Sequence, residues 1–213
     1  MKKIFILLIG LAVAVFANGQ TIKVQGGISI SKMNWEVPIG SVPTIFDKTF
    51  IGYSIYAGVD YLDKEYFNLS SNIGMIRKGG KDDEVYFYEK PDVFIGSINK
   101  LTLDYLSINT TFDVKYPIKE KVSPFISVGP RLDFVLKRSI IFDKMEELRN
   151  ISVGLLLGAG VKYDISNFQI GLRADYYLDF IKPAKFFDTN DKLYGRISLN
   201  TFTVNLTVGY RIK

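Results

Sequence analysis

Seven charged residues fall on the polar side of alternating segments, and their types could do chemistry. They are Asp60, Arg131, Asp133, Lys162, Arg173, Asp175 and Arg211. Carboxylates interleaved with cations could relay protons or ions, but burial and pairing perturb ionisable groups in purely structural networks as well. We favour the structural role, a salt-bridge network in the interior of the fold that holds neighbouring segments in register.

The composition removes the commonest catalytic and metal-binding groups. The chain contains no histidine and no cysteine, which excludes a Ser-His-Asp triad, histidine-dependent zinc sites and thiolate metal sites. Hydroxyl groups are present, but no base that could activate them is recognisable beside them. We therefore predict no catalytic residues, no bound metal and no cofactor, and the sequence identifies no ligand.

The N-terminus has the pattern of a secretion signal. Two lysines follow Met1, an apolar run extends over 4–16, and small residues precede Gln20, as in a signal peptide cut before that glutamine. The run is too short to cross a bilayer as a helix. We predict a signal peptide at 1–19 and one mature domain at 20–213. Loss of two lysines lowers the formal net charge from +5 to +3, and nothing suggests nucleic-acid binding.

Apolar residues recur at every second position in eight segments, which is the period of a β-strand. The segments are 21–33, 50–61, 66–78, 101–116, 122–137, 151–163, 168–180 and 199–212. Long links at 34–49, 79–100, 138–150 and 181–198 alternate with short links at 62–65, 117–121 and 164–167. This rhythm predicts an all-β fold, an eight-stranded antiparallel up-and-down transmembrane β-barrel with tight periplasmic turns and large outer loops.

Two strands are less regular than the others. In 101–116 the apolar phase moves between Tyr105 and Leu106, and we predict a β-bulge there. In 122–137, Pro124 and Pro130 fall on the apolar face. Proline cannot donate to a ladder and usually lies at an edge or a bulge, whereas a closed barrel has no edge.

The aromatic residues indicate that the apolar face points outward. Rings of that face gather near the strand ends and aliphatic residues fill the middle, as in the girdles of membrane barrels. The rings are Tyr61, Phe67, Phe112, Tyr116, Tyr163, Phe168 and Tyr210 near short links, and Tyr53, Phe134, Tyr176, Phe180 and Phe202 near long links. The other face combines glycines with charges of both signs, and eight strands enclose a lumen just wide enough for side chains. We predict a plugged polar interior.

Several features of the links suggest partners. The cationic segment 77–81 (RKGGK) marks a strand end, where clustered cations can attract the phosphates of lipopolysaccharide or simply extend their charged groups from the wall into water. The first two long links also carry apolar residues, which can mark a partner surface, extend the rim of the barrel or pack on one another. We expect outer-membrane lipid and lipopolysaccharide as partners, envelope proteins as further partners, and a monomeric barrel.

Six segments follow one another in the order VQGGISIS (24–31), IRKGGK (76–81), YLSINTTFDVKY (105–116), FISVGPRLDFVL (125–136), GLLLGAGVKYDISNFQIGLRADYYL (154–178) and VGYRI (208–212). In this order the mature chain resembles the PorT-like outer-membrane β-barrel family. Ser107 and Asn109 replace a Glu-x-Pro step of that family, and the chain ends on Lys213 instead of an aromatic residue. The resemblance implies an eight-stranded barrel in a Gram-negative outer membrane, with some members linked to type IX secretion, and it carries over no functional residue.

These observations favour a non-enzymatic outer-membrane barrel that acts through its outer loops in structure, adhesion or an envelope complex. One alternative is a secreted or periplasmic lipocalin-like barrel that carries an apolar ligand, because such a barrel alternates with its apolar face inward. Another is a barrel enzyme acting on lipid, against which the lack of histidine argues.

Overall fold

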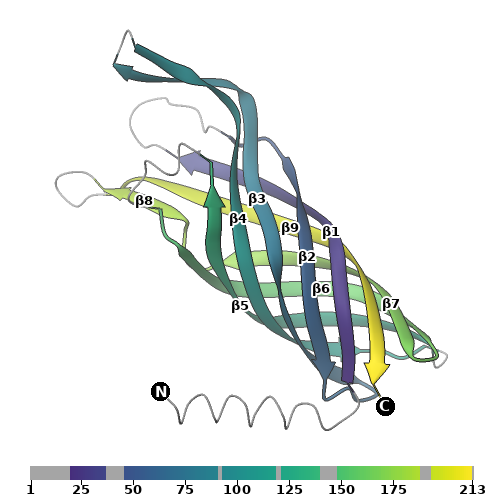
Figure 1. Ribbon diagram of the computed structural model, residues 1–213. Helices are drawn as coiled ribbons and strands as arrows, with labels where there is room; N and C mark the ends of the chain where they lie inside the picture. The colour runs from purple at the N-terminus through teal and green to yellow at the C-terminus, as the bar shows by residue number, and fades with distance from the viewer. Residues whose placement is uncertain are drawn as a thin grey trace, which may run out of the picture.

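The computed structural model describes residues 20–36, 46–90, 93–118, 121–139, 148–187 and 193–212. Nine strands form one closed sheet (Figure 1). They are β1 (Gln20–Glu36), β2 (Phe50–Tyr61), β3 (Phe67–Lys90), β4 (Val93–Lys115), β5 (Val122–Arg138), β6 (Ile151–Ile165), β7 (Phe168–Asp179), β8 (Ala184–Phe187) and β9 (Leu193–Ile212). The signal peptide predicted at 1–19 lies outside the described residues.

The barrel has eight positions around its wall. Each strand from β1 to β6 pairs antiparallel with the next, β7 pairs with β9, and β9 closes the ring on β1 from Gln20↔Ile212 to Glu36↔Arg196. The short β8 pairs with β9 beyond the end of β7, so it continues the position of β7. The predicted eight-stranded antiparallel barrel is confirmed.

The two ends of the barrel differ, and we name them by their connections. At the turn end lie the short links 62–66, 116–121 and 166–167, together with Gln20 and Ile212. The opposite end, at which the strands lead into the remaining links, is the loop end (Figure 1). No helix of the described segments is long and apolar enough to span a bilayer.

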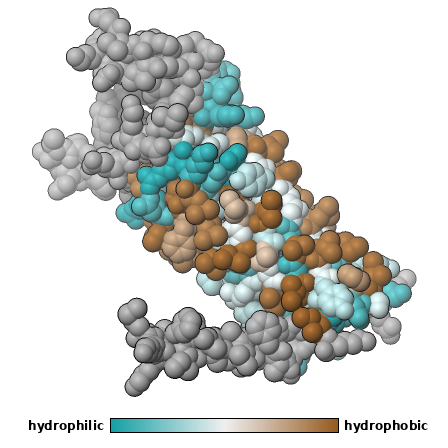
Figure 2. Space-filling view, in the orientation of Figure 1, coloured by the Kyte–Doolittle hydropathy of each residue, from teal (hydrophilic) through white to brown (hydrophobic). Residues whose placement is uncertain are grey.

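The apolar side chains point outward along the membrane-facing wall. Ile55 is 60% exposed and Leu206 is 64% exposed, and Figure 2 shows hydrophobic residues along the wall between the two ends. On the same strands, alternate polar residues such as Thr203 and Asn205 are buried. The alternation therefore has the facing that a membrane barrel requires, and it excludes the lipocalin-like arrangement in which the apolar face lines the interior.

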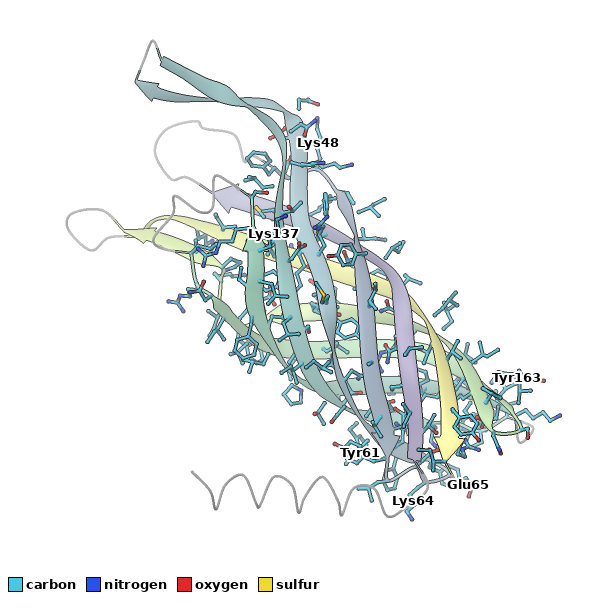
Figure 3. All side chains as sticks on the ribbon, in the orientation of Figure 1. Lys48, Tyr61, Lys64, Glu65, Lys137 and Tyr163 are labelled. Atoms are coloured by element: carbon cyan, nitrogen blue, oxygen red, sulfur yellow. The ribbon has the colours of Figure 1, made fainter. Side chains whose placement is uncertain are left out.

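Rings on the outer wall lie toward both ends of the barrel, and Phe180, just after β7, is an exposed ring near the loop end. Near the turn end, Phe67 packs on Phe112 with ring centroids 5.6 Å apart, and Phe168 meets Tyr210 edge-on at 5.3 Å. Figure 3 shows the labelled Tyr61 and Tyr163 near this end, beside Lys64 and Glu65. Amphipathic rings beside charged residues mark the level at which the wall passes from hydrocarbon to water.

The second long link is mostly strand, contrary to the prediction of a loop over 79–100. β3 runs to Lys90, β4 begins at Val93, and their pairing continues through Val85↔Ile98 and Phe87↔Gly96. β4 pairs with β5 only as far as Leu103↔Arg138. Residues 84–90 and 93–98 therefore project beyond the barrel as a two-stranded ribbon, which we call the arm (Figure 1).

The predicted bulge between Tyr105 and Leu106 of β4 is misplaced. Every odd residue of β4 from Leu101 to Asp113 is buried, so this strand keeps one phase throughout. The irregularity lies in β5, where Leu136 is extra between the pairs Asp104↔Lys137 and Tyr105↔Val135. The apolar residues changed phase in the sequence because the interior itself becomes apolar above Tyr105.

Buried apolar residues fill the interior at the loop end. The loop-end cluster comprises Met33, Phe46, Tyr56, Ile76, Leu101, Leu103, Tyr105, Leu148, Leu156, Tyr177, Ala184, Ile197 and Leu199. Most come from the upper parts of the strands, and Phe46, Leu148 and Ala184 come from links or from β8. The upper barrel is thus built like a soluble barrel, with its apolar side chains inside.

The two prolines of β5 are accommodated without opening the barrel. Pro130 points outward and keeps Leu155 of β6 as its partner, while the register with β4 skips from Asn109↔Arg131 to Phe112↔Val128. The missing donor of proline thus coincides with an interruption on the β4 side. Pro124 lies near the turn end, where its carbonyl accepts a hydrogen bond from the Tyr116 amide at 2.9 Å.

Candidate functional site

A cluster of paired charges occupies the interior nearer the turn end. We call it the lower cluster; it comprises Lys23, Asp60, Asp113, Lys162, Arg173 and Asp175. Lys23 of β1 and Lys162 of β6 both contact the Asp60 carboxylate, the latter at 2.8 Å. Strands from opposite sides of the barrel therefore meet on one carboxylate.

The second half of the lower cluster is centred on Arg173. Its guanidinium contacts the two oxygens of Asp175 at 2.7 and 2.9 Å and donates to the Ser127 hydroxyl at 2.9 Å. Asp113 joins the two halves, because it lies 3.6 Å from the Lys162 ammonium and 3.8 Å from the Arg173 guanidinium. The cluster is one connected network across five strands.

A second group of charges, the upper cluster, lies between the lower cluster and the loop-end cluster. It comprises Lys78, Arg131, Asp133 and Asp179. Lys78 contacts Asp133 at 2.8 Å, and Arg131 joins Asp133 to Asp179. Removal of the Asp133 carboxylate would leave the buried Lys78 without its acidic partner and Arg131 with Asp179 alone, which is costly where water cannot reach the charges.

The loop-end cluster borders the upper cluster through three of its own residues, Tyr56, Tyr105 and Tyr177, which we call the tyrosine layer. The hydroxyls of Tyr56 and Tyr177 are 3.0 Å apart. The Lys78 ammonium and the Arg131 guanidinium each lie 4.7 Å from the centre of the Tyr177 ring. A ring that contacts cations and also belongs to an apolar cluster suits a boundary between polar and apolar layers.

The charges of the two clusters balance, and two cavities beside them are small. In the described part of the chain, the two clusters together hold five cations, Lys23, Lys78, Arg131, Lys162 and Arg173, and five carboxylates, those of Asp60, Asp113, Asp133, Asp175 and Asp179. Cavities among these side chains include two of about 10 Å³ each, each no larger than one water molecule needs. This arrangement seals the lumen.

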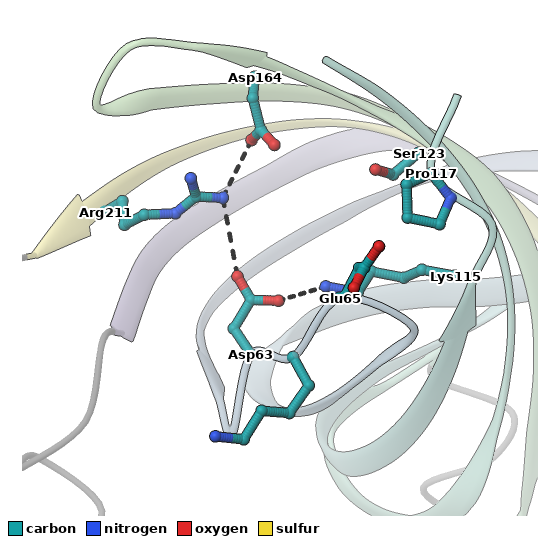
Figure 4. Close-up of a pocket in the computed structure, with 8 residues that line it drawn as sticks. Asp63, Glu65, Lys115, Pro117, Ser123, Asp164 and Arg211 are labelled. Atoms are coloured by element: carbon teal, nitrogen blue, oxygen red, sulfur yellow. Dashed lines mark hydrogen bonds and ion pairs between the residues drawn. The ribbon is translucent and has the colours of Figure 1, made fainter. Parts of the chain in front are cut away.

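A wider pocket opens at the turn end (Figure 4). It has a volume of about 640 Å³ and is lined by charged side chains, among them Asp63, Lys115, Asp164 and Arg211. Arg211 lies 3.2 Å from Asp164 and 3.7 Å from Asp63, which also pairs with Lys115. These pairs form a rim around the mouth, and solvent reaches them.

The structure brings together most of the charged residues singled out in the sequence. Asp60, Arg131, Asp133, Lys162, Arg173 and Asp175 lie buried in the interior. Arg211 does not: its side chain is 36% exposed and belongs to the mouth. Sequence reasoning missed Lys23, Lys78, Asp113 and Asp179 as members, although strict alternation places each of them on an inward-facing position.

The cationic segment 77–81 is divided between the two faces of the wall. Lys78 is buried in the upper cluster, so it cannot bind lipopolysaccharide phosphates as the sequence suggested. Arg77 faces outward, makes two hydrogen bonds to the Asp104 carboxylate at 2.6 and 2.7 Å, and lies 5.0 Å from the Tyr53 ring. Among the described residues, no group of three or more potential ligands could hold a metal ion.

Apolar exterior, charged and sealed interior and unequal ends define a membrane-spanning β-barrel whose lumen is filled by its own side chains. The chain belongs to the outer membrane protein beta-barrel domain family, whose model matches residues 4–211. No curated protein sequence matches the chain.

Solved outer-membrane barrels are similar to this chain at low sequence identity. The attachment invasion locus protein Ail of Yersinia pestis is 20% identical, with 92% of this chain and 99% of that chain covered and a TM-score of 0.46. Neisserial surface protein A is 15% identical, with 90% and 97% covered and a TM-score of 0.48. The barrel domain of Pseudomonas aeruginosa OprF is 12% identical, with 92% and 98% covered and a TM-score of 0.46.

Proposed function

We propose that this protein is a non-enzymatic component of the outer membrane that works through its loop end, in adhesion or in docking to other envelope proteins. The observation that carries the proposal is the sealed interior: paired charges fill the lumen and apolar side chains close its loop end. A barrel of this kind has little capacity for transport, whereas its arm extends well beyond the wall. We also expect outer-membrane lipid and lipopolysaccharide around the wall.

The charged groups of the interior support a structural role over a catalytic one. Each acid of the two charged clusters contacts a cation. The loop-end cluster separates these charged groups from the solvent at the loop end. Fold alone does not decide whether a barrel is an enzyme. The proposal therefore rests on this chain's own side chains. The PorT-like resemblance makes a type IX secretion complex one class of envelope partner.

The arm offers a direct test. Replacing residues 84–97 by Asn-Gly, which favours a tight hairpin turn, should leave a barrel that still shows heat-modifiable migration on gels. In intact cells, chemical cross-links to envelope proteins or attachment to surfaces should be lost. The paired exchange Lys64→Gln with Glu65→Gln at the turn end is the control. Unchanged cross-linking and attachment without the arm would contradict the proposal.

The sealed lumen has its own test in planar lipid bilayers. The purified barrel should insert without resolvable single-channel steps. Arg131→Ala removes a side chain that joins two carboxylates in the upper cluster, and it should produce small, brief openings. Stable conductance of the unchanged protein would show that the interior is a pore.

A further inference from the structure

Phe46 occupies an unusual place for a residue of a connecting link. It precedes β2, in the link from β1, yet its side chain is completely buried inside the loop-end cluster. Its backbone has φ of 60°, in the left-handed region that bulky residues adopt rarely. Such strained positions persist where surrounding contacts enforce them, and they gather at ligand clamps and switch segments.

The wall of the barrel is shaped to receive this residue. A Cβ at Gly80 of β3 would lie 2.1 Å from the Phe46 carbonyl oxygen and 2.7 Å from the Met33 Cβ. A glycine is therefore needed where the link crosses β3. Met33, Ile76 and Leu101 are fully buried in the same cluster. Phe46 thus inserts into an apolar recess whose walls belong to the barrel.

A few polar contacts to the rim of β3 hold the inserted segment. The Phe46 amide donates to the Asp82 carboxylate at 2.8 Å. Lys48 exchanges two backbone hydrogen bonds of 3.0 Å with Lys81, and its ammonium lies 2.5 Å from Asp83. The hydrogen bond to Asp83 raises the pKa of Lys48. The Lys48–Asp83 contact is open to solvent, where an ion pair contributes little, whereas the Phe46 ring is completely buried and anchors the segment from inside.

We propose that Phe46 is a displaceable stopper in a binding site for a small apolar group, an aromatic ring or a short alkyl chain, that enters from the loop end. Displacement exchanges one ring for another in the same recess and relaxes the left-handed backbone at Phe46. The ligand would lie against Met33, Ile76 and Leu101 above the tyrosine layer. The charged clusters below remain closed, so the site binds without forming a channel.

This arrangement fixes how affinity should respond to mutation. The recess is open only when Phe46 is out, so the apparent affinity is the intrinsic affinity reduced by the open fraction. Phe46→Ala empties the recess and should strengthen binding. Asp82→Ala removes the acceptor of the Phe46 amide, raises the open fraction and should strengthen binding to a lesser extent.

Methionine methyl groups provide a readout that separates the recess from the bilayer. Met33 is buried beside Gly80, and Met75 faces outward on β3. The full mature chain, labelled with ¹³C-methyl methionine in lipid nanodiscs, is titrated with benzene. The unchanged protein should show a saturable shift of Met33 while Met75 stays unmoved. Half-saturation should fall at least tenfold in Phe46→Ala and severalfold in Asp82→Ala, and Glu65→Ala at the turn end should leave it unchanged.

Three results would overturn the proposal. The first is that Met33 of the unchanged protein does not respond up to the solubility limit of benzene, which would make Phe46 a permanent core residue. The second is that Met33 and Met75 shift together and without saturation, which would show that benzene only partitions into the lipid. The third is that the Asp82→Ala variant binds benzene no more tightly than the unchanged protein does. If Phe46→Ala does not fold, the Asp82→Ala variant alone decides between the two outcomes.

Discussion

The membrane-embedded barrel and its loop-end extension are made from the same strands but have opposite interiors. Below the tyrosine layer, charged residues face the axis and leucines face outward; above it, Met33, Leu101 and Ile197 face the axis. The difference follows from the surrounding solvent, because lipid accepts apolar side chains that water rejects. One alternating strand can thus lie in both lipid and water if its inward-facing residues change from polar to apolar at the level where the outer wall passes from lipid to water.

The largest expected effect is in the embedded half. Asp133→Ala leaves Lys78 and Arg131 without their shared carboxylate in a sealed interior, so the free energy of unfolding should fall by about 3–5 kcal/mol. Urea unfolding of the barrel in lipid measures it. The exposed Asp83→Ala is the control, with a change within about 0.5 kcal/mol. A loss for Asp133→Ala as small as that of the control would mean that water reaches the upper cluster.

The same Leu→Ala change should cost different amounts in the two regions. Leu101→Ala removes a fully buried side chain in the loop-end cluster and should lower the free energy of unfolding by about 2–5 kcal/mol. Leu206→Ala removes a side chain that faces lipid, and acyl chains can refill that space, so we expect about 1 kcal/mol or less. Urea titration of both variants checks the difference. Equal losses would remove the distinction between the two interiors.

A charge on the outer wall should be costly where the wall faces hydrocarbon. Leu155 pairs with Pro130 and Leu178 on the membrane-facing side. Leu155→Arg should block insertion or lower the free energy of unfolding by about 2–4 kcal/mol. Folding into vesicles, followed by gel shift, measures the effect, with Leu155→Met as control. Normal insertion of the arginine variant would place this position outside the hydrocarbon.

The smallest effect is expected at the Arg77–Asp104 pair on the outer wall, near the boundary between lipid and water. Arg77 pairs with Asp104, but its side chain is 36% exposed. Arg77→Gln should lower the free energy of unfolding by less than about 1 kcal/mol, and salt should reduce the difference further because solvent screens the pair. Unfolding at low and high ionic strength tests this. A large loss that salt does not change would mean that the pair is desolvated by lipid.

The sequence predicted the barrel because the alternation of β6, β7 and β9 is nearly unbroken and short turns separate long links. It did not predict the arm, since residues 79–100 contain glycines and charges that read as a loop, whereas pairing between β3 and β4 carries the strands through. The run from Leu101 to Tyr105 was interpreted as a bulge because a single polarity was assumed for the whole interior. The phase change follows from an interior that becomes apolar toward the loop end, where Leu101, Leu103 and Tyr105 are buried.

The candidate site was recoverable in part for a related reason. Asp60, Arg173 and Asp175 lie in strictly alternating strands, so their inward facing could be deduced from the sequence. Lys78 was assigned to the surface because it stands among cations at a strand end. Arg211 was assigned to the interior although it lies at the mouth, since alternation gives the facing of a residue but not its depth. Which charges pair depends on shear and tilt, which one sequence does not encode locally.

One measurement tests most directly whether the interior is polar in the membrane-embedded barrel and apolar at the loop end. The chain has no cysteine, so single cysteines at each position of 199–208 in β9 can carry a nitroxide label whose relaxation by oxygen and by a water-soluble nickel chelate is recorded in lipid. Labels at 202, 204, 206 and 208 should respond strongly to oxygen, and labels at 203, 205 and 207 to neither agent. The label at Leu199 should be shielded from both, and that at Asn200 reached by nickel. Oxygen maxima at 203, 205 and 207, or a Leu199 label as open to oxygen as that at Leu206, would contradict the account.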